Sequence, residues 1–388
     1  MTATLDASPR FRWDRLTSAS ALGYCLLAAG LSVGVVLKEL RGQFGMNGVV
    51  TALHSSTFGV ALLCMGLLGV RLVNRIGRRA AVGLTALAIT SGVTLFCLGP
   101  IWPVTLAGTA IAGAGGALLV LVMPGVISDH HGPHRAAAFA ATNGVAGIVG
   151  VLFSLAIGAA LSAGWSWRPV YLGITAMVTL ALVAVGHPVT IPAAENTGGY
   201  NLRPLRDARI RRPWSFVITA VLADFAVGVW SVTYLGEVGG ASSGAAPVLA
   251  ASFALTMFAS RLLLPSIVLL FGARTIAVSF IGTGLGALVM VLGPNSLVQT
   301  VGLAIIGFAA GPLYPLTVDR FYAEVGDQLD SVTLGGYCSL ASGVAVTLGP
   351  LALGVLSDLV GLRWALLAVP AVCLVGAVTQ RHRSMDGH

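Results

Sequence analysis

Two charged side chains stand out because they lie within long apolar runs. Asp224 lies about ten residues into the run at 214–236, and Arg261 lies about nine residues before the end of the run at 246–270. A charge in the core of a bilayer costs about 2.5–3.5 kcal/mol, so such residues are usually functional. Because consecutive spanning helices run antiparallel, the spacing places both side chains at similar depth, where they can form an ion pair.

This arrangement would suit a proton switch. A carboxylate beside an arginine stays ionised, whereas a desolvated carboxylate that loses its partner favours the protonated form. We therefore expect Asp224 to bind a coupling proton, and Arg261 to stabilise it or to hold an anionic substrate. The alternative is a structural ion pair that fixes helix packing. His54 is a third candidate, since imidazole titrates near neutral pH, although it lies near a run end where it would be a hydrated interfacial residue.

Further polar residues predict a substrate pocket. Asp224, Gly228, Ser231 and Tyr234 share one helical stripe, which suggests a cavity-facing surface. The other candidates are polar or aromatic residues at plausible depth in different runs, with ordinary packing as the alternative for the aromatic ones: Tyr24, Asn143, Trp230, Tyr314, Tyr337 and Ser339.

The segment Asp129-His130-His131 and the nearby His134 have spacing that could bring imidazoles together around a metal ion. No cysteine or second acid completes the set, and a polar turn is expected at this point of the chain. The sequence therefore predicts no metal site, and no motif predicts a cofactor.

The composition defines the class of protein. Of the 388 residues 56% are hydrophobic and 9% are charged, and the mean hydropathy is +0.90. Soluble domains have about a quarter of their residues charged. These values exclude a soluble enzyme, a nucleic-acid-binding protein and a disordered scaffold, and no nucleotide-binding loop or catalytic triad spacing is present. The composition therefore indicates an all-α membrane protein. Because the sequence has no nucleotide-binding loop, we expect any transport to be driven by ion or solute gradients or to be passive.

The chain contains twelve apolar runs, each near the length of about 20 residues that spans a bilayer. We predict a six-helix bundle at 1–187, a polar linker at 188–213 with five arginines, and a second six-helix bundle at 214–388. The runs lie at 17–37, 48–70, 80–99, 104–127, 137–162, 168–187, 214–236, 246–270, 274–293, 297–317, 331–356 and 363–380.

The arginine and lysine distribution predicts the orientation. With the N-terminus inside, 17 basic residues fall on the inner side and 4 on the outer side. Because inner loops carry the positive excess, we expect an inner (plasma) membrane protein with both termini cytoplasmic.

The two halves share landmarks. Gly77 and Gly272 follow the second and eighth runs, 195 residues apart, and Gly164 and Gly361 precede the sixth and twelfth runs, 197 residues apart. Parallel repeats of this kind place a substrate site between the halves near the bilayer midplane.

The loop after the second run resembles the signature G-x-L-x-D-R-x-G-R-R of the major facilitator superfamily. Leu72, Arg75, Gly77, Arg78 and Arg79 match it, while Asn74 replaces the acid, which implies a weaker latch. The resemblance covers the whole chain and implies a monomeric twelve-helix secondary carrier that works by alternating access.

The loop between the tenth and eleventh runs is expected to take part in gating. Asp319 and Arg320 lie there, and its acids are expected to meet Arg75, Arg78 or Arg79 across the halves. The acids are Asp319, Glu324, Asp327 and Asp330. Gly311 and Pro312 predict a break in the tenth helix.

Asp224 followed by Trp230 is similar to the seventh helix of fucose-permease-like symporters. We therefore expect a proton-coupled transporter of a small organic solute, in contact with lipid and not with nucleic acid. The alternatives are a multidrug or natural-product efflux antiporter, favoured by the mostly apolar pocket, and a non-transporting receptor on the same fold.

Overall fold

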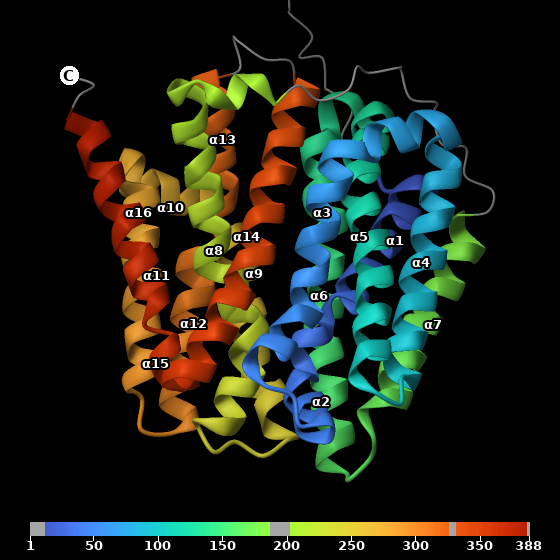
Figure 1. Cartoon of the computed structure of the whole chain (residues 1–388). Coiled ribbons are helices and arrows are strands. Elements are labelled where there is room, and N and C mark those ends of the chain that lie inside the picture. Colours follow the sequence, from blue (N-terminus) through green and yellow to red (C-terminus); the bar gives the residue numbers. More distant parts are fainter. Residues whose placement is uncertain (1–11, 187–201, 326–330, 386–388) are drawn as a thin grey trace, which may run out of the picture.

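The computed structural model describes residues 12–186, 202–325 and 331–385, which are almost entirely helical (Figure 1). The first half contains α1 (Arg15–Gly30), α2 (Leu37–Phe44), α3 (Gly48–Ile76), α4 (Arg78–Leu98), α5 (Trp102–His131), α6 (Arg135–Ser162) and α7 (Trp167–Gly186). The second half contains α8 (Ala208–Glu237), α9 (Ala245–Leu262), α10 (Leu264–Phe271), α11 (Thr275–Leu292), α12 (Ser296–Ala310), α13 (Leu313–Val325), α14 (Ser331–Val360), α15 (Leu362–Ala365) and α16 (Ala368–Met385).

Eleven helical segments of the described chain are long and apolar enough to cross a membrane. The remaining crossing begins with α1, which has 16 residues and is followed by a 3₁₀ turn at Ser32–Val35. Together they confirm the twelve predicted crossings. Large apolar side chains such as Leu269 (87% exposed) and Leu359 (74% exposed) lie on the outer surface, as expected where lipid replaces water as the solvent.

The helices of the first half and those of the second half lie side by side (Figure 1). Helices α1 and α8 begin at the end drawn at the top of Figure 1, which we call the linker face. The opposite face carries α2.

Glycines bring the two halves into close contact along α3 and α14. A Cβ on Gly59 would lie 2.3 Å from the Thr347 nitrogen, and one on Gly343 would lie 2.9 Å from the Leu63 side chain. Helices α6 and α9 form a second inter-half contact, in which a Cβ on Gly158 would lie 2.7 Å from the Gly244 carbonyl. Small residues permit such close backbone approach between membrane helices.

Three positions at which helices begin or end bear on the predictions made from the sequence. The predicted linker end at 213 is wrong, because α8 begins at Ala208, where the Asp207 side chain accepts a hydrogen bond from the Arg209 nitrogen. The predicted break in the tenth helix is confirmed, since α12 ends at Ala310 and α13 begins at Leu313. The eighth predicted run is also divided, between α9 and α10, at a position followed by a proline in the first turn.

Candidate functional site

A small cavity of about 20 Å³ lies between the two halves, and we call it the central cavity. A cavity needs about 10–15 Å³ to hold one water molecule, so this space suits a water or a proton-carrying group. The first half contributes Gly30, Leu31, Val33, His54, Ser55, Thr57, Phe58 and Thr109, and helix α8 of the second half contributes Phe225 and Val229.

His54 is 1% exposed, so the alternative that it is a hydrated interfacial residue is wrong. Its Nδ1 lies 3.0 Å from the Val50 carbonyl oxygen, and its Nε2 lies 2.9 Å from Thr105 Oγ1 on α5. Thr105 Oγ1 also lies 2.8 Å from the Trp102 carbonyl oxygen. Thr105 therefore has two alternative acceptors for its single hydroxyl proton.

The hydroxyl of Ser55 is buried and has no hydrogen-bond partner in the described structure. Leaving a buried polar group unpaired costs about 1–3 kcal/mol, so such groups usually meet a ligand or a water. Thr57 and Thr109 lie nearby, 3.4 Å apart at their Oγ1 atoms. His54 was the sequence signal for this wall, whereas Thr109 on α5 had no such signal.

Asp224 and Arg261 interact electrostatically, but no ion pair joins them in the described structure. The Arg261 Nε lies 3.3 Å from the Gly311 carbonyl oxygen, at the break between α12 and α13. Tyr314, on α13, interacts electrostatically with both Asp224 and Arg261. Both charges belong to the second half.

The stripe on α8 does not line the central cavity. Gly228 faces Phe253 of α9, where an added Cβ would lie 3.1 Å from the ring. The Ser231 hydroxyl donates to the Gly228 carbonyl at 2.9 Å, and the Tyr234 hydroxyl donates to Met290 of α11 at 3.2 Å. The nearby residues Phe225 and Val229 on another side of α8 line the central cavity instead.

The other predicted pocket residues are dispersed. Trp230 is fully buried, and its Nε1 donates to the Pro350 carbonyl at 3.3 Å. Asn143 is a polar neighbour of the buried Tyr24 hydroxyl, although the two do not meet in a hydrogen bond. Tyr314 approaches Ser342 of α14, while Tyr337 is buried and Ser339 is half-buried on α14.

The expected inter-half gate at the linker face is wrong for Arg78. This arginine pairs with Asp129 at the end of α5, in its own half, because α4 and α5 pack together along their length. Arg320 pairs with Glu324 one turn further along α13, at 2.7 Å. Asn74 and Arg75 are exposed near the end of α3, and Asp319 lies on α13. The remaining two acids, Asp327 and Asp330, lie outside the described residues.

Polar contacts between the halves occur at the opposite face. Arg41 Nη1 lies 2.9 Å from Glu237 Oε2. Asp358 accepts hydrogen bonds from the backbone nitrogens of Gly48 at 2.6 Å and Val49 at 3.1 Å. The described structure is therefore latched across the halves at this face. The sequence had indicated no role for Arg41, Glu237 or Asp358 in such a latch.

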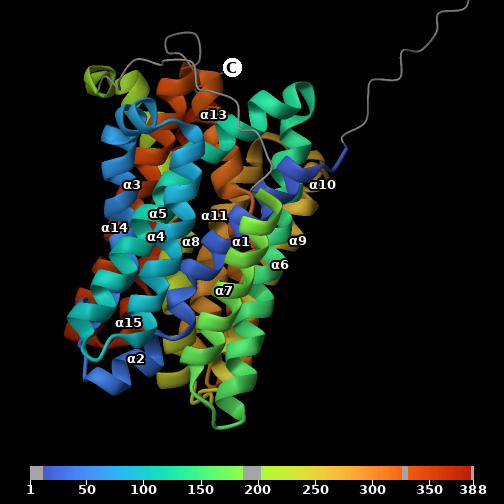
Figure 2. The same cartoon turned by 90° about the vertical axis from the view of Figure 1, so that its right-hand side faces the viewer.

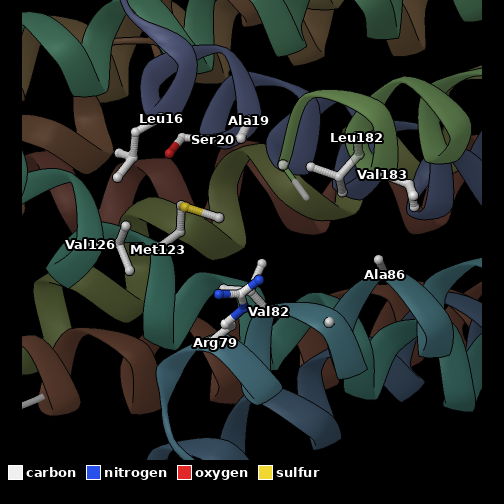
Figure 3. Close-up of a pocket in the computed structure, with 12 residues that line it drawn as sticks. Leu16, Ala19, Ser20, Arg79, Val82, Ala86, Met123, Val126, Leu182 and Val183 are labelled. Atoms are coloured by element: carbon white, nitrogen blue, oxygen red, sulfur yellow. The ribbon is translucent and has the colours of Figure 1, made fainter. Parts of the chain in front are cut away.

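A larger cavity of about 230 Å³ lies within the first half, and we call it the peripheral cavity. Helices α1, α4, α5 and α7, which can be followed in Figure 2, surround this cavity. The side chain of Arg79 points into the cavity from α4, with Leu16 and Ser20 of α1 on the far side (Figure 3). The other lining residues are Ala19, Val82, Gly83, Ala86, Met123, Val126, Leu182, Val183 and Gly186.

Comparison with solved structures shows the same fold in several transporters. The nucleoside transporter NupG superposes with a TM-score of 0.76 at 13% identity, covering 95% of this chain and 98% of NupG. The xylose transporter XylE from E. coli, in a partially occluded inward-open conformation, gives 0.74 at 13% identity, with 94% and 96% coverage. A bacterial homologue of the lysosomal transporter Spinster, inward-facing and occupied, gives 0.70 at 17% identity, with 95% and 96% coverage.

Sequence comparison agrees with the fold. An uncharacterised transporter, y4wD of Sinorhizobium fredii, is 31% identical over 159 residues, which is 37% of this chain and 41% of y4wD. The chain therefore aligns with less than half of that relative's length. The model of the Major Facilitator Superfamily matches residues 20–328. With twelve crossings in two halves and a cavity between them, the chain belongs to the Major Facilitator Superfamily and is a multi-pass membrane transporter.

Proposed function

We propose that this chain is a proton-coupled secondary transporter of a small organic solute, and that the coupling proton binds at the central cavity. The observation that carries the proposal is the position of His54. It is a buried, titratable side chain in the wall of the space between the halves. Alternating access requires a binding site between the halves that is reachable from one face at a time.

The surroundings of His54 can accept a proton without losing a hydrogen bond. In the neutral ring Nδ1–H donates to the Val50 carbonyl, and the Thr105 hydroxyl donates to Nε2. After protonation Nε2–H donates to Thr105 Oγ1, and the hydroxyl turns to the Trp102 carbonyl. Because each state satisfies the same groups, a rotation of one hydroxyl accompanies proton uptake and release.

Asp224 and Arg261 supply a second proton site in this proposal. Arg261 contacts the Gly311 carbonyl at the break between α12 and α13, so movement at that break would change the field at Asp224. A buried carboxylate that loses part of its interaction with an arginine favours the protonated form. The pair would thereby couple helix movement in the second half to proton binding.

We place the linker face in the cytoplasm and the chain in the plasma membrane. The support is the excess of arginines in the loops on the same side as the linker. With the opposite face latched by Asp358 and by the Arg41–Glu237 pair, the described conformation then belongs to the inward-facing or occluded part of the cycle. The chain acts as a monomer in this proposal.

The test is a proton-flux assay in proteoliposomes loaded with a pH-sensitive dye and supplied with a panel of metabolites and drugs. We expect one class of solute to move protons with the wild-type protein. His54→Gln and Asp224→Asn should abolish that movement, and His134→Gln, at the linker face, should retain it. Solute accumulation without proton movement, or full activity in both cavity and pair variants, would overturn the proposal.

Export of a lipophilic compound is the second candidate. The peripheral cavity favours it, because apolar side chains dominate its wall and it lies between helices of the first half. The same liposomes separate the candidates. Export by antiport drives protons opposite to the drug, whereas solute–proton symport moves both in the same direction.

A further inference from the structure

Three metal-ligating side chains from two distant parts of the chain meet at the linker face. Asp14 is the N-cap residue of α1, and His130 and His131 are the last two residues of α5. One ligand atom from each of the three lies within 4.8 Å of the others. Nothing in the proposed transport mechanism uses this cluster.

The contacts within the cluster are specific. His130 Nε2 lies 2.5 Å from Asp14 Oδ2, while the two imidazole rings are 4.8 Å apart at their centroids and nearly perpendicular. Thr17 links the remaining atoms, since its hydroxyl oxygen lies 2.7 Å from Asp14 Oδ1 and 2.9 Å from His131 Nε2. The backbone nitrogen of Thr17 also donates to Asp14 Oδ1 at 2.8 Å.

We infer that Asp14, His130 and His131 form a binding site for a divalent transition-metal ion, of which Zn²⁺ is the best fit. Two imidazole nitrogens and one carboxylate oxygen are a common zinc ligand set, with donor distances of about 2.0–2.2 Å and a fourth position for water. The present separations need only small side-chain rotations to reach those distances. Asp14 Oδ1 stays bonded to Thr17, which orients the carboxylate as outer-shell groups do at metal sites.

The carboxylate of Asp14 is accessible to an ion from solution, because its side chain is 42% exposed.

The consequence of binding is a link between α1 and α5. Asp14 precedes Leu16, and His130 follows Val126 by one turn, and both of those residues line the peripheral cavity. An ion at the cluster would fasten two of the four cavity helices at the linker-face rim. We therefore expect bound metal to stiffen the first half without touching His54 or Asp224.

The experiment uses the full-length protein without a histidine tag, purified in detergent and stripped with a chelator. Zn²⁺ binding is measured by calorimetry, Co²⁺ binding by visible absorption, and stability by thermal unfolding with and without Zn²⁺. We expect one ion per chain and a Co²⁺ absorption spectrum typical of four-coordinate geometry. We also expect a higher unfolding temperature with Zn²⁺ than without it. Asp14→Asn, His130→Gln and His131→Gln should each weaken the affinity for Zn²⁺ by at least roughly 10–100-fold. That is the loss typical of changes to outer-shell partners, and these three residues are proposed as direct ligands.

Two controls keep the test decisive. His134→Gln removes a histidine from the same turn that is outside the three-residue cluster, and it should retain wild-type affinity. Asp14→Asn keeps a good N-cap residue, so lost binding there reports the missing carboxylate rather than an unfolded α1. Absence of saturable binding to the wild-type protein, or an equal loss in His134→Gln, would overturn the site even if another variant failed to fold.

Discussion

Asp358 at the end of α14 caps the beginning of α3, where its Oδ1 accepts a hydrogen bond from the Gly48 nitrogen at 2.6 Å across the two halves. Its Oδ2 accepts from the Val49 nitrogen at 3.1 Å, and the Asn47 side chain accepts from the Val50 nitrogen at 2.9 Å. The first N–H groups of a helix have no partner within the helix. One carboxylate therefore completes a helix end and holds the halves together.

Replacing Asp358 with Asn should loosen this latch. The asparagine amide has no negative charge to interact with the positive end of the α3 dipole. It also has one acceptor oxygen in place of two. We expect the free energy of opening at the opposite face to fall by about 1–2 kcal/mol, so that the open population rises roughly 5–30-fold. The measurement is the rate at which a membrane-impermeant thiol reagent labels a cysteine placed at Ser55, with the exposed Cys64 replaced by alanine.

Glu39→Gln is the matched control for Asp358→Asn. Glu39 lies on α2 at the same face and makes no inter-half hydrogen bond or ion pair among the described residues. The Glu39→Gln variant should be labelled at the same rate as the parent. An Asp358→Asn protein that labels no faster than the parent would show that this cap does not limit opening.

The Arg41–Glu237 pair should contribute less than the Asp358 cap. Its side chains are 23% and 37% exposed, and exposed ion pairs contribute about 0.2–1 kcal/mol. Reversing either charge alone should increase labelling at the Ser55 position, whereas exchanging both charges should restore the parental rate. Failure of the exchanged pair to restore it would mean that the two residues act independently.

Thr105→Val tests the hydroxyl relay beside His54. Valine has nearly the same shape but leaves His54 Nε2 without a donor or an acceptor. We expect the rate of solute-driven proton movement to fall about tenfold, the equivalent of losing one hydrogen bond of about 1.4 kcal/mol. Thr85→Val is the control, since the Thr85 hydroxyl bonds to Ala81 of its own helix. Equal losses in both variants would indicate a packing effect.

Gly77→Ala should destabilise the turn between α3 and α4. Gly77 has φ 81° and ψ 155°, a region that other residues occupy at a cost of about 1–3 kcal/mol. No atom lies within 4 Å of an added Cβ, so the expected loss comes from backbone strain and not from a clash. A lower unfolding temperature in detergent checks this. Gly173→Ala, with equal space on helical backbone in α7, should not lower it.

The sequence alone was sufficient for the number of crossings, the division into two halves and the superfamily. Apolar runs of spanning length must form helices in a bilayer, because every backbone polar group has to be paired internally. Gly311 and Pro312 also predicted the break between α12 and α13, since proline removes a donor and clashes with the preceding turn.

Which side of each helix faces a cavity depended on the tertiary structure. The stripe through Tyr234 looked like a cavity surface, yet it packs on α9 and α11, while Phe225 and Val229 line the central cavity. In a membrane protein apolar residues face lipid, protein and cavity alike, so the hydrophobic pattern gives a weak signal of direction.

Long-range partners were the other feature that only the fold decided. Arg78 meets Asp129 instead of the second half, Asp358 reaches Gly48 from 310 residues away, and Asp14 reaches His130 from 116 residues away. A charge or a ligand in the sequence carries its chemistry but not the identity of its partner. Helix packing selects that partner, because it brings particular helix ends together within hydrogen-bonding distance.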